Sequence, residues 1–253
     1  MRSLAIRIPY SLVAYPLEAL DIVVAGTGVV LCHTLGLRKA SSWFRKKAWA
    51  SLTIKFALAN VEIEGLEHLN HDGSLVLTPN HQGVLEYPIF HSRFQRRPYF
   101  LAKANMAKIP FFGQAMVASG TLFIHREDGN QAVTILQQEE QAIIDRKKLI
   151  VDYPEGTRTR DPQHRIGPFK KGPFVLAIRT QSPVVPMVCT GVADFVAADH
   201  ILMNPAPRIR MKILPPIPTR GMTYADRDRL RDEVRDLMIK TYLEMGGAGG
   251  MPP

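Results

Sequence analysis

The chain has 253 residues, enough for one large domain, and its 46% hydrophobic content is that of an ordinary globular protein. Lysine and arginine number 32 against 23 aspartates and glutamates, and the net charge of +9 favours nucleic acid or anionic lipid as a partner. Nucleic acid is the weaker choice because the chain has no zinc-finger, RNP or basic-helix pattern. The composition also argues against a disulfide framework, since it has only two distant cysteines, and against a metal site, since no ligand cluster has suitable spacing.

The N-terminal segment is apolar, and we expect it to be helical and associated with a membrane. The run from Ile22 to Leu37 is 16 residues long and carries no formal charge, whereas a spanning helix needs roughly 20 apolar residues. Pro16, Gly26 and Gly28 argue further against a straight span. A signal peptide fits poorly, because the run lies late and no small-x-small cleavage site follows. The sequence favours a re-entrant or interfacial segment; the alternative is a helix buried against the main domain.

Residues 41–60 mix aromatic and basic side chains, as a helix at the level of lipid headgroups would. A plain amphipathic core helix would show a similar pattern. We therefore predict N-terminal membrane-associated helices at residues 1–59 and a main domain at residues 60–253. The aromatic and basic residues concerned are Trp43, Phe44, Trp49, Phe56, Arg45, Lys46, Lys47 and Lys55.

In the main domain, short apolar runs alternate with helical patterns. Predicted helices cover residues 131–147 and 174–180, and a last helix begins at a Thr223–Asp226 capping pair and ends at Gly246. This alternation predicts an α/β fold with a mostly parallel central sheet flanked by helices. The predicted strands are Ser74–Leu77, Pro98–Ala102, Thr121–Ile124, Leu149–Val151, Val184–Val188 and Ile209–Leu214.

His81 is the candidate general base. It follows the strand Ser74–Leu77 at a strand-to-helix junction, where α/β folds place their ligands. On one regular helix, residues five apart point about 140° away from each other, so His81 and Glu86 meet only if a turn separates them. Gly83 supplies a bend for that turn. If Glu86 holds one imidazole nitrogen, the other can take a proton, and the carboxylate stabilises the imidazolium that forms.

Two further segments suit an anionic ligand. The strand-like segment Gly120–Arg126 ends in an arginine that could bind a phosphate through two hydrogen bonds, although a solvated strand-end arginine is the commoner case. At residues 153–158, Pro154 and Gly156 force a tight turn after a strand, around which three side chains project. These side chains are Glu155, Thr157 and Arg158.

Taken in order, these blocks resemble the motifs of the glycerophospholipid acyltransferase family, which includes 1-acylglycerol-3-phosphate acyltransferases. The resemblance covers roughly residues 60–220, and the ordered set is specific whereas no single block is. This chain departs from the family pattern at Glu86, where aspartate is usual, and at Gly83, where serine or threonine is frequent. The matching blocks are Asn80-His81 with Glu86, Gly120 with Phe123-Ile124 and Arg126, Tyr153–Arg158, Val185-Pro186, and Lys103 with Ile109–Gly113.

The resemblance implies an O-acyltransferase in which His81 deprotonates an acceptor hydroxyl and Glu86 orients the imidazole. The implied acceptor is lysophosphatidate or another lysophospholipid, and the donor is acyl-CoA or acyl carrier protein, with no metal or other cofactor. No serine or cysteine has a nucleophile-elbow context, so no acyl-enzyme is required. The implied substrate-binding residues are Lys103, Arg126 and Arg158 for the acceptor phosphate and the turn Glu155, Gly156 and Thr157 around it.

Two alternatives stay open at this point. The acceptor could be a different lysolipid or an aminolipid, since the same blocks would serve either. The changes at Glu86 and Gly83 also allow a non-enzymatic lipid-binding protein with an impaired site. If the substrate is a lipid, the basic surface and the apolar N-terminus predict a monotopic or peripheral protein on the cytoplasmic face of a membrane.

Overall fold

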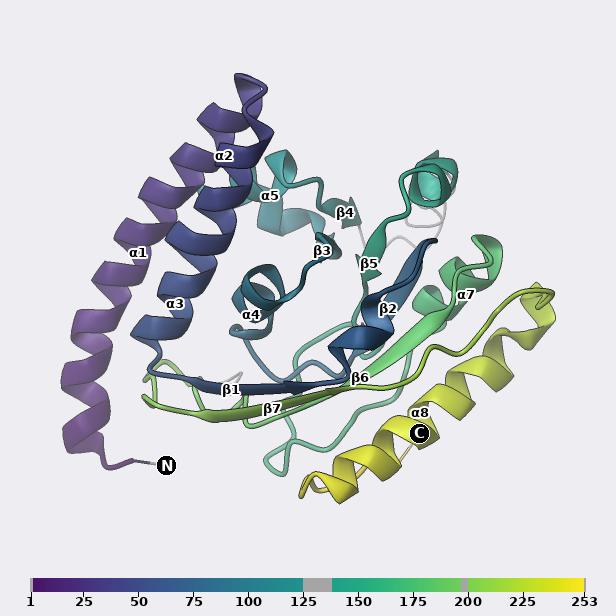
Figure 1. Ribbon diagram of the computed structural model, residues 1–253. Helices are drawn as coiled ribbons and strands as arrows, with labels where there is room; N and C mark the ends of the chain where they lie inside the picture. The colour runs from purple at the N-terminus through teal and green to yellow at the C-terminus, as the bar shows by residue number, and fades with distance from the viewer. Residues whose placement is uncertain (1, 125–137, 197–199, 253) are drawn as a thin grey trace.

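The computed structural model describes residues 2–124, 138–196 and 200–252 (Figure 1). Seven strands form one sheet in the order β1-β7-β6-β2-β5-β3-β4. The β6–β7 pair is antiparallel and the other neighbouring pairs are parallel, which confirms the predicted mostly parallel α/β sheet. The strands are β1 (Asn60–Glu64), β2 (Leu75–Pro79), β3 (Pro98–Lys103), β4 (Leu122–Ile124), β5 (Leu149–Val151), β6 (Val184–Thr190) and β7 (Arg208–Ile213).

All six predicted strands are present, with ends shifted by at most two residues, but the sequence analysis missed β1. This edge strand alternates half-buried Val61 and Ile63 with exposed Glu62 and Glu64, so it has no continuous apolar run. It pairs with β7, which lies almost 150 residues later in the chain. Of the predicted 131–147 helix, residues 138–147 are described; residues 138–145 are helical and residues 146–147 form a turn.

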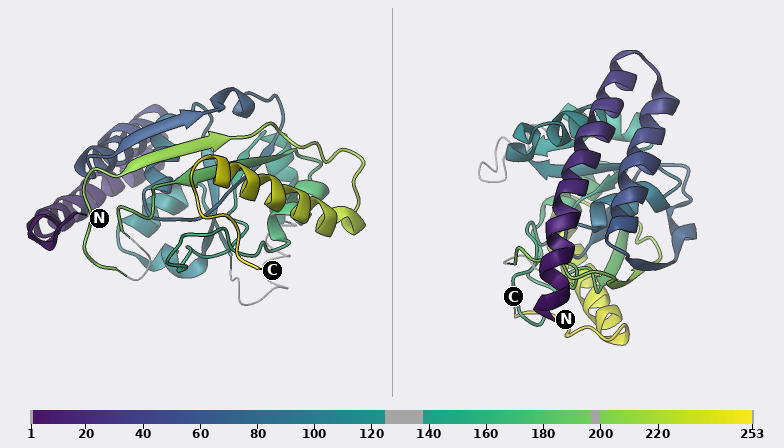
Figure 2. Two further views of the ribbon diagram at one scale, coloured as in Figure 1. Left: turned by 90° about the horizontal axis from the view of Figure 1, so that it is seen from below. Right: turned by 90° about the vertical axis from the view of Figure 1, so that its left-hand side faces the viewer.

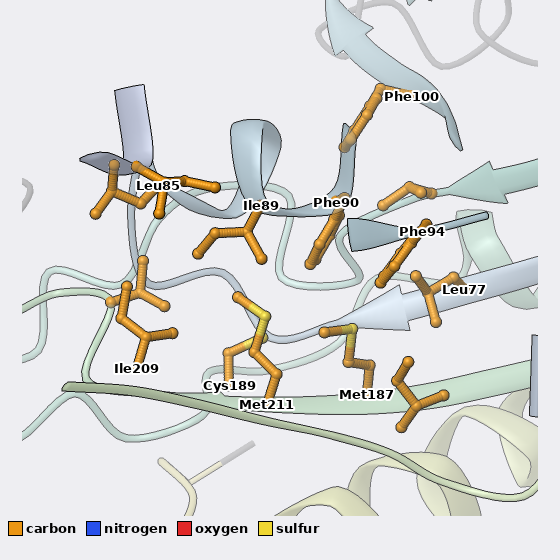
Figure 3. Close-up of a cluster of buried hydrophobic side chains, with 14 of the residues drawn as sticks. Leu77, Leu85, Ile89, Phe90, Phe94, Phe100, Met187, Cys189, Ile209 and Met211 are labelled. Carbon is orange, nitrogen blue, oxygen red and sulfur yellow. The ribbon is translucent and has the colours of Figure 1, made fainter. Parts of the chain in front are cut away.

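Helices cover both faces of the sheet. On one face α4 (Glu86–Arg93) inserts Ile89, Phe90 and Phe94 against Leu77 and Cys189 of the strands (Figure 3). On the other face α7 (Gly172–Arg179) and α8 (Arg227–Glu244) bury a second apolar cluster that includes Phe174 and Met238. Each face of the sheet therefore has its own core, as an α/β fold requires.

The predicted start of the last helix is confirmed. Asp226 Oδ2 accepts hydrogen bonds from both the backbone N–H and the hydroxyl of Thr223, at 2.8 and 3.1 Å, in a capping box. A 3₁₀ turn, Tyr224–Asp226, leads directly into α8. Gly246, with φ of +84°, follows the helix in a left-handed conformation that suits glycine.

The N-terminus is one long helix, α1 (Leu4–Thr34), of 31 residues. Pro16, Gly26 and Gly28 lie inside this continuous helix. Gly28 serves close packing, because a Cβ there would lie 2.5 Å from the ring of Phe44. A second helix runs back beside α1 (Figures 1 and 2). Its parts are α2 (Arg38–Trp43), a π-helical turn (Phe44–Ala50) and α3 (Ser51–Phe56).

One side of α1 packs on the rest of the protein and the other is exposed. Ala25 and Val29 face inward, while Leu12 and Leu20 are 71% and 60% exposed. The alternative of a helix buried against the main domain is therefore not what the structure shows. Within the described residues, α1 is the helix whose length and hydropathy would suffice to cross a membrane.

We expect Cys189 to be unreactive in the folded protein. It lies fully buried in β6, and burial, with Glu86 and Glu155 nearby, raises the pKa of its thiol well above the ordinary value. Titration with a thiol reagent at pH 8 should therefore detect at most one group, the half-buried Cys32, before unfolding and two afterwards. A Cys32→Ser control should show none in the native state, and a fast-reacting Cys189 would contradict the described packing.

Candidate active site

The candidate site forms where two adjacent parallel strands end. β2 and β5 are in register from Leu75 and Leu149 onward, so the loops that follow them start at the same edge of the sheet. His81 lies in the first loop and Glu155 in the second. The two loops are joined directly, because the His81 N–H donates to Glu155 Oε1 at 2.7 Å and the Thr159 N–H donates to the His81 carbonyl at 2.9 Å.

His81 and Glu86 are in contact. Nδ1 of His81 lies 2.7 Å from Oε2 of Glu86, whose side chain is completely buried at the first residue of α4. The other oxygen, Oε1, accepts the backbone N–H groups of Gln82 at 2.6 Å and Gly83 at 3.1 Å. An ionised carboxylate satisfies all three donors, which assigns the proton to Nδ1. Among the described residues nothing hydrogen-bonds Nε2, so this nitrogen can serve as the base.

Tyr153 fixes the plane of the imidazole. Its ring stacks on His81 with centroids 4.0 Å apart and planes 25° from parallel. Burial first, and then the neighbouring Glu86, raise the pKa of the Tyr153 phenol well above its usual value, so it stays neutral. The sequence analysis treated Tyr153 only as the start of a motif; the available signal was an aromatic residue immediately before Pro-Glu-Gly.

Contacts from distant parts of the chain hold the histidine loop. The side-chain amide of Asn80 makes two hydrogen bonds with the backbone of Cys189 in β6, at 2.6 and 3.0 Å. Gln82 donates to the hydroxyl of Tyr242 in α8 at 2.7 Å, and that hydroxyl donates to the carbonyl of His164. Sequence reasoning missed Gln82 and Tyr242, because no local pattern relates residues 160 positions apart.

Comparison with known proteins identifies the family of this chain. A sequence model described as Acyltransferase matches residues 60–190, more than half of the 253 residues and the whole span from β1 to β6. The chain belongs to the acyltransferase family. This acyltransferase is 28% identical to the 1-acyl-sn-glycerol-3-phosphate acyltransferase of Saccharomyces cerevisiae over 217 residues, which cover 86% of this chain and 71% of the yeast protein.

Two further similarities concern a human protein and a solved structure. The acyltransferase is 29% identical to human 1-acyl-sn-glycerol-3-phosphate acyltransferase alpha over 192 residues, or 75% of this chain and 67% of the human one. Its fold matches the crystal structure of the 1-acyl-sn-glycerophosphate acyltransferase PlsC from Thermotoga maritima with a TM-score of 0.80. That match covers 97% and 98% of the two chains at 21% identity, and it shows a common fold.

Glu155 of the acyltransferase connects loops. Its side chain is 8% exposed, and its second oxygen accepts the Gly167 N–H at 2.9 Å. Burial raises the pKa of this carboxyl, while the backbone N–H groups of His81 and Gly167 oppose the rise. The two carboxylate oxygens of Glu155 thus hold the backbone of His81 and the backbone of Gly167, and so connect their loops.

Three other predicted substrate residues, Lys103, Thr157 and Arg158, lie in segments at the same edge of the sheet. Lys103 is exposed at the end of β3, two strands from β2 or ~10 Å across the sheet. Thr157 is exposed and Arg158 is half-buried in the loop after β5. Arg126 lies outside the described residues. Among the residues that are described, no three His, Cys, Asp or Glu side chains gather as a metal site would need.

Gly156 is required by the turn, and we expect Gly156→Ala to lower the free energy of unfolding by about 1–2 kcal/mol. Its φ is +70°, and a Cβ there would lie 2.9 Å from Cε and Nζ of Lys170. Urea denaturation measures the change. The matched control is Gly172→Ala at the start of α7, where a Cβ meets nothing within 4 Å, and this variant should be neutral or slightly stabilised. Equal losses in the two variants would contradict the argument.

Proposed function

We propose that this acyltransferase moves an acyl chain from acyl-CoA or acyl carrier protein to the hydroxyl of lysophosphatidate or a related lysophospholipid. The observation that carries the proposal is the 2.7 Å contact between His81 Nδ1 and the buried Glu86, which leaves Nε2 as a base. The names of the yeast and human relatives support the choice of a 1-acylglycerol-3-phosphate as acceptor.

In the proposed reaction, His81 Nε2 takes the proton of the acceptor hydroxyl as the oxygen attacks the thioester carbonyl. The tetrahedral intermediate then expels the thiolate, and the C–S bond breaks. The imidazolium returns its proton to the departing sulfur, so the enzyme ends unchanged. Glu86 stabilises the imidazolium, and the stacked Tyr153 keeps the ring in the orientation that both transfers need.

Cations at the carboxyl edge of the sheet would bind the acceptor phosphate. Lys103 is the last residue of β3, Arg158 lies in the segment that follows β5, and Arg126 follows β4 in the sequence. The turn at Gly156 and the Thr157 side chain would line the same phosphate site. Guanidinium groups bind phosphate oxygens in pairs, so the two arginines would give the stronger contacts.

We also propose that the protein lies on the cytoplasmic face of a membrane, held by α1 and the helix beside it. The exposed apolar side of α1, with the exposed Trp43 and Lys47 of the second helix, supports this arrangement. A lysophospholipid would then reach His81 from the lipid side, while the donor would arrive from the aqueous side.

The assay that tests the function measures thiol release from palmitoyl-CoA and from an acyl carrier protein thioester in mixed micelles. Lysophosphatidate should stimulate release, and the product should be the diacyl phosphate. Arg126→Ala should lose activity with phosphate-bearing acceptors and keep activity with a neutral one. Release that another lysolipid or an aminolipid stimulates, and lysophosphatidate does not, would replace the proposed acceptor; no release with any acceptor would refute the activity.

A further inference from the structure

The chain turns back after α8 and runs along this helix (Figure 2). We call residues 246–251 the return segment. A Cβ at Gly247 would overlap the ring of Tyr242, and a Cβ at Gly250 would overlap Cδ1 of Ile239. A glycine-rich sequence is typical of a flexible linker, but here the missing side chains allow the backbone to pack directly on α8.

The return segment pairs with residues 164–167, which we call the linking segment and which belong to the loop after β5. The Ile166 N–H donates to the Gly249 carbonyl at 2.9 Å, and the Met251 N–H donates to the Ile166 carbonyl at 2.8 Å. These two bonds make a parallel β-bridge between Ile166 and Gly250. The Ile166 side chain is 1% exposed and lies in the core cluster under α7 and α8, so the linking segment is fixed on this side.

Arg235 of α8 joins the two segments. Its Nε donates to the carbonyl of Gly167 at 3.1 Å, and its Nη2 donates to the carbonyl of Met251. Within the part of the chain that the structure describes, no carboxylate forms an ion pair with Arg235. The guanidinium therefore serves backbone carbonyls, and hydrogen bonds from a charged donor are stronger than those between neutral groups.

The linking segment also reaches the candidate active site. The Gly167 N–H donates to Glu155 Oε2 at 2.9 Å, and Glu155 Oε1 accepts the N–H of His81 at 2.7 Å. A Cβ at Gly167 would lie 3.1 Å from Glu155 Oε2, so the close approach of this carboxylate depends on glycine. A continuous series of hydrogen bonds therefore runs from Arg235 to the backbone of the candidate base.

We propose that Arg235 is a positioning residue for acyl transfer, which acts through Gly167 and Glu155 to fix the backbone of His81. Arg235 and Glu155 hold the Gly167 peptide groups from opposite sides, and the return segment holds Arg235 in place. A displacement of about 1 Å at a reacting group can cost about a hundredfold in rate, so a small shift of this backbone would reach the chemistry. The inference rests on the proposed function, because it assigns His81 as the base.

Steady-state kinetics with palmitoyl-CoA and lysophosphatidate give the first measurement. Arg235→Met should lower kcat by about tenfold or more and change KM by less than about threefold, since the base is displaced while the substrate contacts remain. Arg235→Lys should restore part of the loss, because lysine keeps the charge and can reach one of the two carbonyls. The matched control is Arg231→Met, one turn earlier in α8, whose partners are the surface carboxylates Asp228 and Asp232. This control should have the kcat of the parent.

Hydrogen exchange of the amides gives the second measurement and separates positioning from general stability. In Arg235→Met, exchange should be faster in the peptides that contain residues 164–167 and His81, whose N–H groups belong to the proposed link. It should be unchanged in the peptides that cover β3 and β1, which lie on other parts of the sheet. Faster exchange throughout the protein would assign Arg235 a general structural role and overturn the proposal.

The remaining outcomes are distinct. A folded Arg235→Met protein with the kcat of the parent would overturn the proposal, as would unchanged exchange at His81. If Arg235→Met does not fold, Gly250→Val makes the same two tests, because its side chain would meet Ile239 and displace the return segment. A parent protein that is inactive with every acceptor would contradict the proposed function instead, and the exchange measurement would still decide whether Arg235 holds the backbone of His81.

Discussion

Replacement of His81 by alanine should lower kcat/KM for acyl transfer by about 10²–10⁴-fold, the usual contribution of a positioned general base. The imidazole is held by Glu86 on one side and by Tyr153 on its face, so the substitution removes a positioned base. The assay is thiol release with lysophosphatidate as acceptor, and KM should change much less than kcat. His200→Ala, at an exposed position, is the control and should retain full activity.

The structural consequence of this substitution should be small. His81 is partly exposed, and its backbone contacts to Glu155 and Thr159 do not depend on the imidazole. A His81→Ala protein that melts like the parent and is still fully active would remove His81 from the mechanism. Loss of activity together with unfolding would instead assign it a structural role.

Glu86→Gln should reduce both activity and stability. Glu86 accepts three hydrogen bonds in complete burial, one from His81 and two from the backbone of Gln82 and Gly83. Glutamine has only one acceptor oxygen, so its NH₂ group would face either the His81 ring N–H or the backbone N–H groups of Gln82 and Gly83. We expect a loss of about 1–3 kcal/mol in the free energy of unfolding. We also expect a fall of about 10²–10⁴-fold in kcat, since the imidazole loses both its orienting acceptor and its counter-charge.

Glu86→Asp restores the residue usual in the family and still should not improve this enzyme. The loop is built around the longer side chain, which reaches His81 and two backbone N–H groups at once. Aspartate is shorter by one methylene, and a displacement of about 1 Å at such a site can cost about a hundredfold in rate. Higher activity of the aspartate variant would show that Glu86 impairs the site. The 2.7 Å contact is the reason we discount the alternative of an inactive lipid-binding protein.

The sequence predicted those parts of the molecule that local patterns determine. The strands β2, β5 and β6 appear as continuous apolar runs because they are covered on both faces of the sheet. Helix geometry indicated that His81 and Glu86 could meet only across a turn, for which Gly83 offered a bend, and the two side chains are in contact. The edge strand β1 was missed because its alternation with Glu62 and Glu64 resembles a surface segment.

The remaining errors and omissions concern tertiary contacts. In the sequence, Pro16 and Gly28 argue against a straight span, yet both lie inside one continuous helix, where the Phe44 ring uses the space that Gly28 leaves. The stacking of Tyr153 on His81 and the hydrogen bond from Gln82 to Tyr242 depend on how distant segments pack. No periodicity or motif contains that information, and only the folded arrangement supplies it.

The hydrogen bond between Gln82 and Tyr242 has a consequence for the order in which the site matures. Residues 80–86 leave the ribosome early, but the support from α8 is synthesised about 160 residues later. At roughly 5–20 residues per second, that interval lasts about 10–30 seconds. During this time the nascent chain has its base and its carboxylate but not the helix that supports them, so full catalytic competence should arise only after α8 has been synthesised.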